Sequence, residues 1–155
     1  MTSPVSLPVG HELVASDFDA YENLTGVWQT FAGFQWIGAT TNPAIGNGSI
    51  TARYIQVGKL VMYNGIIVRG STTTYGTGTW DINLPVTPLS SGWSASGFAR
   101  DNSSGTARQG VGWEASTTTL RPHDVNGDLG AFSATVPFTW TTGDRLAWSA
   151  MYEAA

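Results

Sequence analysis

The sequence predicts an all-β fold, an antiparallel β-sandwich or jelly roll, preceded by an extended N-terminal arm and one short helix. Apolar and polar residues alternate with period two through most of the chain after residue 26, which is typical of half-buried strands. The 19 glycines, 20 threonines and 14 serines favour strands joined by tight turns. A chain of 155 residues is also long enough to fold as one domain around its own core.

The N-terminal residues are expected to form an attachment element. Residues 1–15 contain two prolines and no clear hydrophobic period, which predicts an extended arm. Ser16 is a good helix N-cap, and Asp19 follows three positions later as in a capping box. The helix ends at Gly26, is short, and needs packing against other residues to be stable. Residues 1–24 are therefore predicted to attach the protein to a partner assembly. The residues expected to make the contacts are Pro4, Leu7, Pro8, Phe18 and Tyr21.

Residues 25–155 are predicted to form the β domain. In Ser49–Gln56 apolar and polar residues alternate, the pattern of a half-buried strand. Lys59–Arg69 carries two interleaved apolar sets, as expected for a central strand covered on both faces. The connection at Val57 and Gly58 is short enough to predict a hairpin turn. Further strands are expected at Gly26–Phe31, Gly78–Leu84, Ser94–Asp101, Ala107–Trp113, Ser133–Phe138 and Leu146–Tyr152.

Charge and cysteine content exclude whole classes of function. Only 12% of the residues are charged, the formal net charge is −4, and the seven Lys and Arg residues are scattered, so no basic patch for nucleic acid is expected. The absence of cysteine excludes disulfides, cysteine zinc sites and thiol nucleophiles. No apolar run approaches a membrane span, and the N-terminus does not resemble a signal peptide, so we expect cytoplasmic synthesis without membrane insertion.

Catalytic chemistry is not expected, and no catalytic residue is predicted. The chain has two histidines, His11 and His123, and no nucleophile elbow of the Gly-x-Ser-x-Gly type. A glycosidase would need two carboxylates facing each other across a groove. A small glycan-active enzyme therefore stays open as an alternative that requires such a pair. The acids available for it are Asp81, Asp101, Glu114 and Asp124.

One loop weakly suggests a metal site. Asp124, Asn126 and Asp128 alternate around a glycine, as ligands do in calcium loops. The order of residues fits an EF-hand poorly, because Gly127 precedes the third acidic position and no glutamate follows. The Asn-Gly pair favours a hairpin turn instead. We therefore expect no metal and no cofactor, and leave calcium binding by Asp124–Asp128 as an alternative.

The seven tryptophans divide into core and surface candidates. Trp28, Trp80 and Trp148 lie within strand patterns and are expected in the core. Trp93 lies in a turn-like Ser-Ser-Gly-Trp-Ser segment and Trp113 precedes an acid, so both are candidates for contact with a receptor or partner. If the neighbouring strands pair, Trp113 is also close to two charged residues. The predicted binding set is Trp93, Arg100, Asp101 and Trp113.

Several segments together resemble a recurring block of phage minor tail and other virion structural proteins, especially those of phages infecting actinobacteria. The resemblance covers about residues 24–155, and the order and spacing of the segments are more specific than any one of them. The segments that carry it are Ala44–Lys59, Gly70–Trp80, Leu84–Val86, Val136–Trp140 and Gly143–Ala155.

The resemblance implies a β-rich module that forms homo-oligomers, with a homotrimer expected, and contacts other virion proteins. It implies no catalytic residues. Such modules lie at the distal part of tails, so we expect a tail-tip or tail-knob component that recognises a host cell-surface glycan. A capsid decoration or head-fibre protein is the leading alternative, and a small glycan-active enzyme the second. In either virion role the protein would be made in the host cytoplasm and located in the virion.

Overall fold

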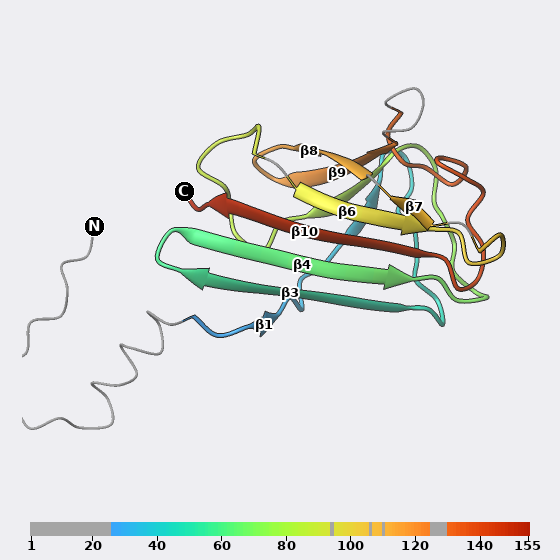
Figure 1. The fold of residues 1–155 in the computed structure, drawn as a ribbon, viewed down its shortest axis with the longest axis horizontal. Helices are drawn as coiled ribbons and strands as arrows, with labels where there is room; N and C mark the ends of the chain where they lie inside the picture. Colours follow the sequence, from blue (N-terminus) through green and yellow to red (C-terminus); the bar gives the residue numbers. More distant parts are fainter. Residues whose placement is uncertain (1–25, 94, 106, 110, 125–129) are drawn as a thin grey trace, which may run out of the picture.

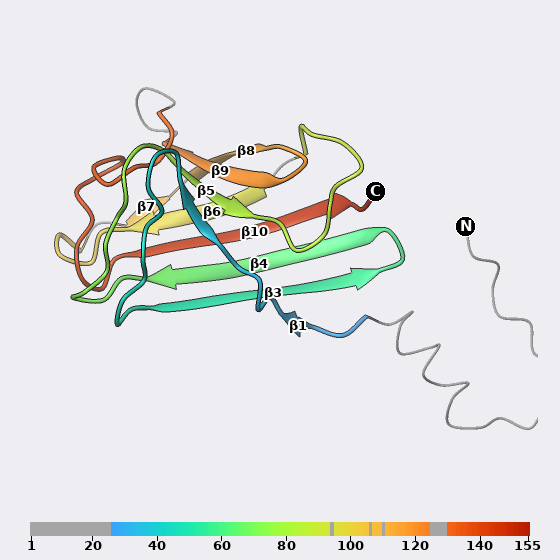
Figure 2. The same ribbon diagram turned by 180° about the vertical axis from the view of Figure 1, so that it is seen from behind.

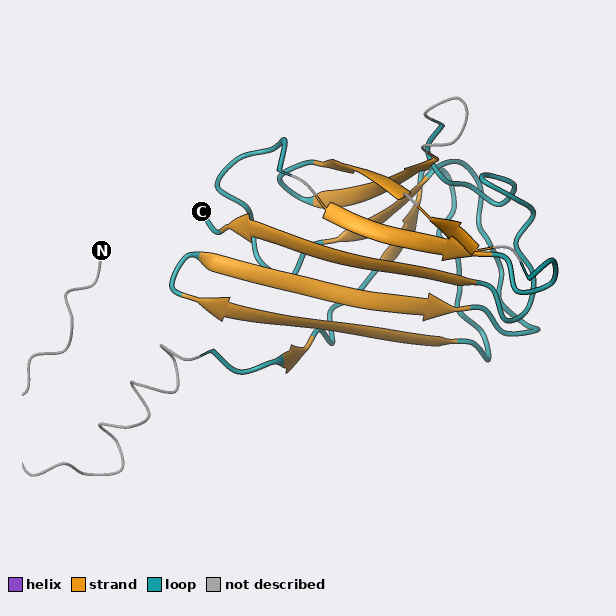
Figure 3. Cartoon of the chain, in the orientation of Figure 1, coloured by secondary structure: helices purple, strands orange, loops and turns teal. Residues whose placement is uncertain are grey.

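The computed structural model confirms the all-β prediction for the residues that it describes. These residues form strands, turns and loops and contain no helix (Figure 3). The strands make two antiparallel sheets that enclose one core in a sandwich-like arrangement. The predicted arm and helix, residues 1–24, lie outside the described part of the chain. The described residues are 26–93, 95–105, 107–109, 111–124 and 130–155.

The larger sheet has six strands in the order β1-β3-β4-β10-β6-β7. Its three long central strands, β3, β4 and β10, run side by side across the molecule (Figure 1). The strands are β1 (Gln29–Thr30), β3 (Ser49–Val57), β4 (Leu60–Val68), β6 (Ala95–Arg100), β7 (Ala107–Gln109) and β10 (Arg145–Glu153).

The smaller sheet has four strands in the order β2-β5-β9-β8. Figure 2 shows the molecule from behind, with β5, β8 and β9 of this sheet labelled. All of its pairs are antiparallel. The strands are β2 (Trp36–Gly38), β5 (Trp80–Asn83), β8 (Val111–Ala115) and β9 (Thr119–Asp124).

The strongest sequence signal, the hairpin after residue 49, is confirmed. β3 and β4 pair along their whole length, and Val57 lies opposite Leu60. Gly58 and Lys59 therefore form a two-residue turn, in which Gly58 has a φ of 59°. This left-handed conformation costs glycine little, which explains the residue at this position.

The core contains large aromatic side chains from both sheets. Trp80 and Trp148 are buried as predicted. The rings of Trp36 and Trp80 meet edge to face with centroids 4.8 Å apart, and Trp113 of the smaller sheet lies 6.4 Å from Trp148 of the larger one. The two sheets are therefore held together by ring contacts across the core.

The prediction for Trp28 was wrong. Its ring is 36% exposed, because β1 is a two-residue edge strand and Trp28 precedes it on the outer face. Thr30 lies opposite Arg53, which is exposed, so residues of β1 in the same phase point away from the core. The guanidinium of Arg53 lies 5.7 Å from the Trp28 ring centroid, a cation–π contact at the surface.

Two strand predictions differ from the structure, and two strands, β2 and β9, were not predicted. The segment Ala107–Trp113 is divided between two sheets, because β7 pairs with β6 whereas β8 pairs with β9. In Ser133–Phe138 the structure has a tight turn, in which the Ser133 amide donates to the Val136 carbonyl. β2 was also not predicted, since three residues are too few to establish a period.

β9 was missed because it contains Pro122, which cannot donate to a strand ladder. The Pro122 carbonyl accepts from the Phe132 amide, on the side away from β8. The nitrogen and carbonyl of one strand residue point to the same side, so the missing donor of Pro122 removes no bond between β8 and β9. The proline is tolerated in the strand for this reason.

Candidate functional site

The outer face of the six-stranded sheet carries an unusual number of exposed apolar side chains. Leu60 and Met62 on β4 are 46% and 38% exposed, Met151 on β10 is 55% exposed, and Phe98 on β6 is 38% exposed. The register places Met62 directly opposite Met151, and both alternate with buried core residues. Residues of the same phase on a strand share a face, so these side chains form one apolar surface.

A groove runs through this surface, and we call it the sheet groove. It consists of two adjoining hollows, of about 270 and 370 Å³, which share Ser96 and Ser149. These two serines lie opposite each other on β6 and β10, and their short side chains keep the floor low. Met62 and Met151 line the first hollow, and Phe98 lines the second. The groove therefore has hydrophobic sides and a floor formed by small side chains.

The same face carries arginines without acidic partners. Arg100 and Arg145 are exposed and lie directly opposite each other on β6 and β10. Within the described residues, no acidic side chain forms an ion pair with either of them. Like charges directly opposite each other on neighbouring strands are destabilising. This pair would be relieved by a negatively charged group on the face.

Asp101 follows Arg100 directly but is not available to it. Its carboxylate accepts from the hydroxyls of Ser103 and Ser104 at 2.7 Å each, and from both of their amides. These hydrogen bonds lower the pKa of Asp101 to about 2. Asp101 is thus used by its own turn.

The edge of the larger sheet is open beside β1. β3 has nine residues, whereas β1 pairs with two of them. A hollow of about 520 Å³ lies where β1 ends, between Phe31, Phe34 and the β3 residues from Ile50 to Arg53. Unpaired strand backbone of this kind is a template for pairing with another segment.

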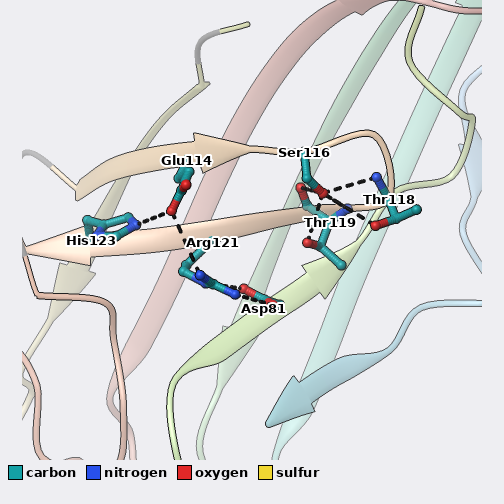
Figure 4. A network of polar contacts seen from close by, with 7 residues as sticks. All are labelled: Asp81, Glu114, Ser116, Thr118, Thr119, Arg121 and His123. Carbon is teal, nitrogen blue, oxygen red and sulfur yellow. Dashed lines mark hydrogen bonds and ion pairs between the residues drawn. The ribbon is translucent and has the colours of Figure 1, made fainter. Parts of the chain in front are cut away.

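The outer face of the four-stranded sheet is different, because its charges are paired. Arg121 on β9 donates from Nε and one terminal nitrogen to the two oxygens of Asp81 on β5, at 2.8 and 3.0 Å. Its other terminal nitrogen lies 3.8 Å from Glu114 on β8, which is also 3.1 Å from His123 Nε2. Figure 4 shows these four side chains in one row across three strands. The hydrogen bonds from Arg121 to Asp81 raise the pKa of Arg121.

This row is the nearest approach to the acidic pair that a glycosidase needs. Asp81 and Glu114 are not mutually remote, since both contact Arg121. Both oxygens of Asp81 accept from the guanidinium, and Glu114 is 65% exposed. Each carboxylate therefore already has a cationic partner, an arrangement that stabilises the strands of the face.

One arginine, Arg69, lies inside the core. Arg69 follows β4, is 2% exposed, and its guanidinium carbon lies 5.0, 5.4 and 3.7 Å from the ring centroids of Trp36, Trp80 and Trp140. None of its guanidinium nitrogens has a hydrogen-bond partner. Burial lowers its pKa to about 9, against the opposing effect of Tyr75 and Asp144. Three aromatic faces, rather than hydrogen bonds, surround this cation.

Asp144 lies beside this arginine and is completely buried. Its carboxylate accepts from the Asn102 amide at 2.8 Å and from the Thr141 amide at 2.5 Å. The backbone of Arg69 pairs with that of Asp144 and Gly143, which extends the β4–β10 ladder by two residues. Arg69 and Asp144 are thus built into the junction between β4 and β10.

The predicted binding residues do not form one exposed cluster. The ring of Trp93 is half-buried and stacks on Tyr152 at 4.7 Å. Trp113 is half-buried as well and faces Gly97 across the core. Arg100 points outward, and Asp101 lies in its own turn. The pairing that would bring Trp113 beside Arg100 does not occur, because β8 pairs with β9.

Sequence reasoning missed the residues that line the sheet groove. The signal was present in Lys59–Arg69, whose two apolar sets indicate a strand covered on both faces. One set, with Val61 and Tyr63, is buried, whereas the other, with Leu60 and Met62, is exposed. Small residues such as Ser149 give no such signal, because the groove floor depends on which strands pair.

The other predicted sites lie partly outside the described residues. The attachment residues Pro4, Leu7, Pro8, Phe18 and Tyr21 fall in residues 1–25, and most of the Asp124–Asp128 loop falls in residues 125–129. Among the described residues, no group of three or more His, Asp and Glu side chains is placed to hold a metal ion. The described part of the chain also contains no helix with the length and hydropathy of a membrane span.

The arrangement that stands out is a surface that combines an apolar groove with two cations that have no acidic partner in the described part of the chain. Such a surface can bind a segment that brings apolar side chains and carboxylates together. Comparisons with protein-family models, with curated proteins and with solved structures each gave no match for this chain.

Proposed function

We propose that this chain is a non-enzymatic structural protein of a phage virion that assembles through the outer face of its six-stranded sheet. The observation that carries the proposal is the sheet groove, lined by Met62, Met151 and Phe98 on an exposed face. Exposed apolar surface of this kind marks sites of protein association. A subunit surrounded by neighbours also needs few surface charges, in keeping with a charged fraction of 12%.

The virion assignment is supported by the sequence resemblance and by how two of its segments lie. The segments Ala44–Lys59 and Gly70–Trp80 contact each other through Asn47 and Thr72. The backbone amide of Asn47 donates to the Thr72 hydroxyl at 2.9 Å. The backbone amide of Thr72 donates to the side-chain oxygen of Asn47 at 3.0 Å. The order and spacing of the resembling segments thus correspond to one packed unit. The assignment to a tail tip or tail knob rests on the resemblance, which implies a position at the distal part of the tail.

The finer parts of the proposal concern assembly and receptor. The protein is proposed to form a homotrimer, to contact other virion proteins through residues 1–24, and to recognise a host cell-surface glycan. The short helix and arm, and the jelly-roll form of the sandwich, belong to this proposal. A capsid decoration or head-fibre role uses the same apolar face and the same arm without a receptor, and it is the competing assignment.

The experiment that tests the function combines labelling with one substitution. Immunogold labelling of virions is expected to mark the tail tip, and label on the head alone would replace the tail assignment with the head one. Met151→Glu places a charge beside the sheet groove and is expected to abolish incorporation into particles, with the circular dichroism of the subunit unchanged. The matched control is Thr117→Glu, in the exposed turn between β8 and β9. Normal incorporation of Met151→Glu would exclude the groove as the assembly surface.

A further inference from the structure

The outer face of the six-stranded sheet lacks a cover among the described residues, although its composition is that of a covered face. Leu60, Met62 and Met151 are exposed there. A strand with apolar residues on both faces is typical of a sheet buried on both sides. Something apolar is therefore expected to lie over this face in the folded protein.

The face also specifies the charge of its cover. Arg100 and Arg145 lie opposite each other without an acidic partner in the described residues, and Arg53 adds a third exposed cation. Glu153 at the end of β10 is the exposed acid on this face within the described residues. A cover with carboxylates would offset the repulsion between the two opposed arginines.

Residues 1–25 have the matching composition. They hold four of the eleven acidic residues of the chain and none of its seven Lys and Arg residues, so the formal charge of −4 lies entirely in this segment. Residues 26–155 carry seven of each and are formally neutral. The four acids are Glu12, Asp17, Asp19 and Glu22. Apolar residues alternate with them along the segment: Val5, Leu7, Val9, Leu13, Val14, Phe18, Tyr21 and Leu24.

The segment is joined to the fold at the edge of this same face. Gly26 lies so close to Ile55 and Val57 that a Cβ on it would overlap their side chains. From β1 to β6 the sheet has four strand spacings, about 19 Å at about 4.8 Å each. The fifteen residues of the predicted extended arm alone reach about 50 Å at about 3.3 Å each. The segment is long enough to cross the whole face.

We propose that residues 1–25 dock across the outer face of the six-stranded sheet of their own chain. Their apolar side chains fill the sheet groove, and their carboxylates lie against Arg100 and Arg145. A tethered segment has an effective concentration in the millimolar range, far above that of a second copy in dilute solution. A neighbouring subunit that assembles through the groove therefore competes with this segment for the same surface. The inference needs only the face and the segment, and it holds whatever the particle.

The test uses the full chain and the absence of native cysteine. Ser149→Cys on the groove floor carries a nitroxide spin label, and the NMR signals of residues 1–25 are compared with the label oxidised and reduced. We expect these signals to lose more than half their intensity. Thr117→Cys, in the exposed turn of the other sheet, is the matched control and should leave them intact. Ser96→Cys, opposite Ser149, gives an independent label position if the first variant folds poorly.

Two outcomes overturn the proposal. Unchanged signals from residues 1–25 with both groove labels mean that the segment does not dock there. Signal loss that appears only when isotope-labelled chains are mixed with separate spin-labelled chains assigns the groove to a second copy.

A charge variant tests the electrostatic part. Arg100→Gln combined with Arg145→Gln should restore most of the lost intensity at low salt, whereas Lys59→Gln in the β3–β4 turn should not. If the double arginine variant and Lys59→Gln restored the same NMR intensity, Arg100 and Arg145 would have no specific role in docking the segment.

Discussion

The two sheets share one core but present opposite outer faces. On the four-stranded sheet, Asp81, Arg121 and Glu114 pair with one another across three strands. On the six-stranded sheet, Arg100 and Arg145 face each other beside exposed methionines, and no acid among the described residues pairs with either. The charged side chains of the first face are paired with one another. The second face has exposed apolar area and uncompensated charge among the described residues, which are properties of a binding surface. The difference separates a face that stabilises the fold from one available for association.

The contrast arises from which residues occupy the outward phase of the central strands. In β9 the outward residues include Arg121 and His123, whereas Leu120 and Pro122 of the opposite phase are buried. In β4 both phases are apolar, so one of them must be exposed when a single layer covers the sheet. The exposed phase is therefore encoded in β4 itself.

The largest expected effect comes from breaking the paired face. Asp81→Ala leaves Arg121 without its two-point partner in a partly buried position, and we expect it to lower the free energy of unfolding by about 2 kcal/mol. Asp81→Asn keeps one hydrogen-bond acceptor and should cost less. Urea unfolding at pH 7 measures both. A loss below about 0.5 kcal/mol for the alanine variant would show that the pair does not stabilise the face.

A smaller effect is expected at the other end of the same row. Glu114 is 65% exposed and lies 3.8 Å from Arg121, so Glu114→Gln should change the free energy of unfolding by at most about 0.5 kcal/mol. The same urea experiment gives the value, with Asp81→Ala as the reference. If the two variants cost the same, the row acts as one network and the division between a buried and an exposed pair is mistaken.

The smallest expected effect concerns Asp101, which follows Arg100 of the six-stranded sheet. Asp101 has a folded-state pKa of about 2, below its ordinary value of 3.8, because it accepts hydrogen bonds from Ser103 and Ser104. Because the pKa of Asp101 is lower in the folded state than in the unfolded state, its ionised carboxylate stabilises the fold at pH values above about 4. This contribution is lost as the pH falls from about 4 to about 2. NMR titration of the Asp101 carboxyl carbon should give a midpoint near 2. A midpoint near 4 would mean that Asp101 is free to partner Arg100.

The local patterns predicted the long strands well. Ser49–Gln56 and Lys59–Arg69 correspond to β3 and β4 within a residue, since strict alternation and a Gly turn leave little freedom. The sheet assignment was not predictable, because Ala107–Trp113 reads as one strand and the break between β7 and β8 depends on long-range pairing. Trp28 was misplaced for a similar reason, as a short strand pattern does not say which face will be covered.

The candidate surface was less predictable than the fold. Its parts lie on three strands, β4, β6 and β10, so Ser96 and Ser149 become a groove floor only through the β6–β10 register. Trp93 was proposed as a surface contact from its turn-like sequence, yet its ring reaches back to stack on Tyr152. Surface sites made by register need the strand order, which no local pattern contains.

The position of Arg69 has a consequence for how the molecule comes apart. Its guanidinium belongs to the end of the longest hairpin, whereas Trp36 and Trp80 belong to the smaller sheet and Trp140 to a loop. If the two sheets separated, the cation would lose the faces of Trp36 and Trp80, so these contacts form only when both sheets are in place. A half-unfolded state is therefore penalised, and the two sheets are coupled into one cooperative unit.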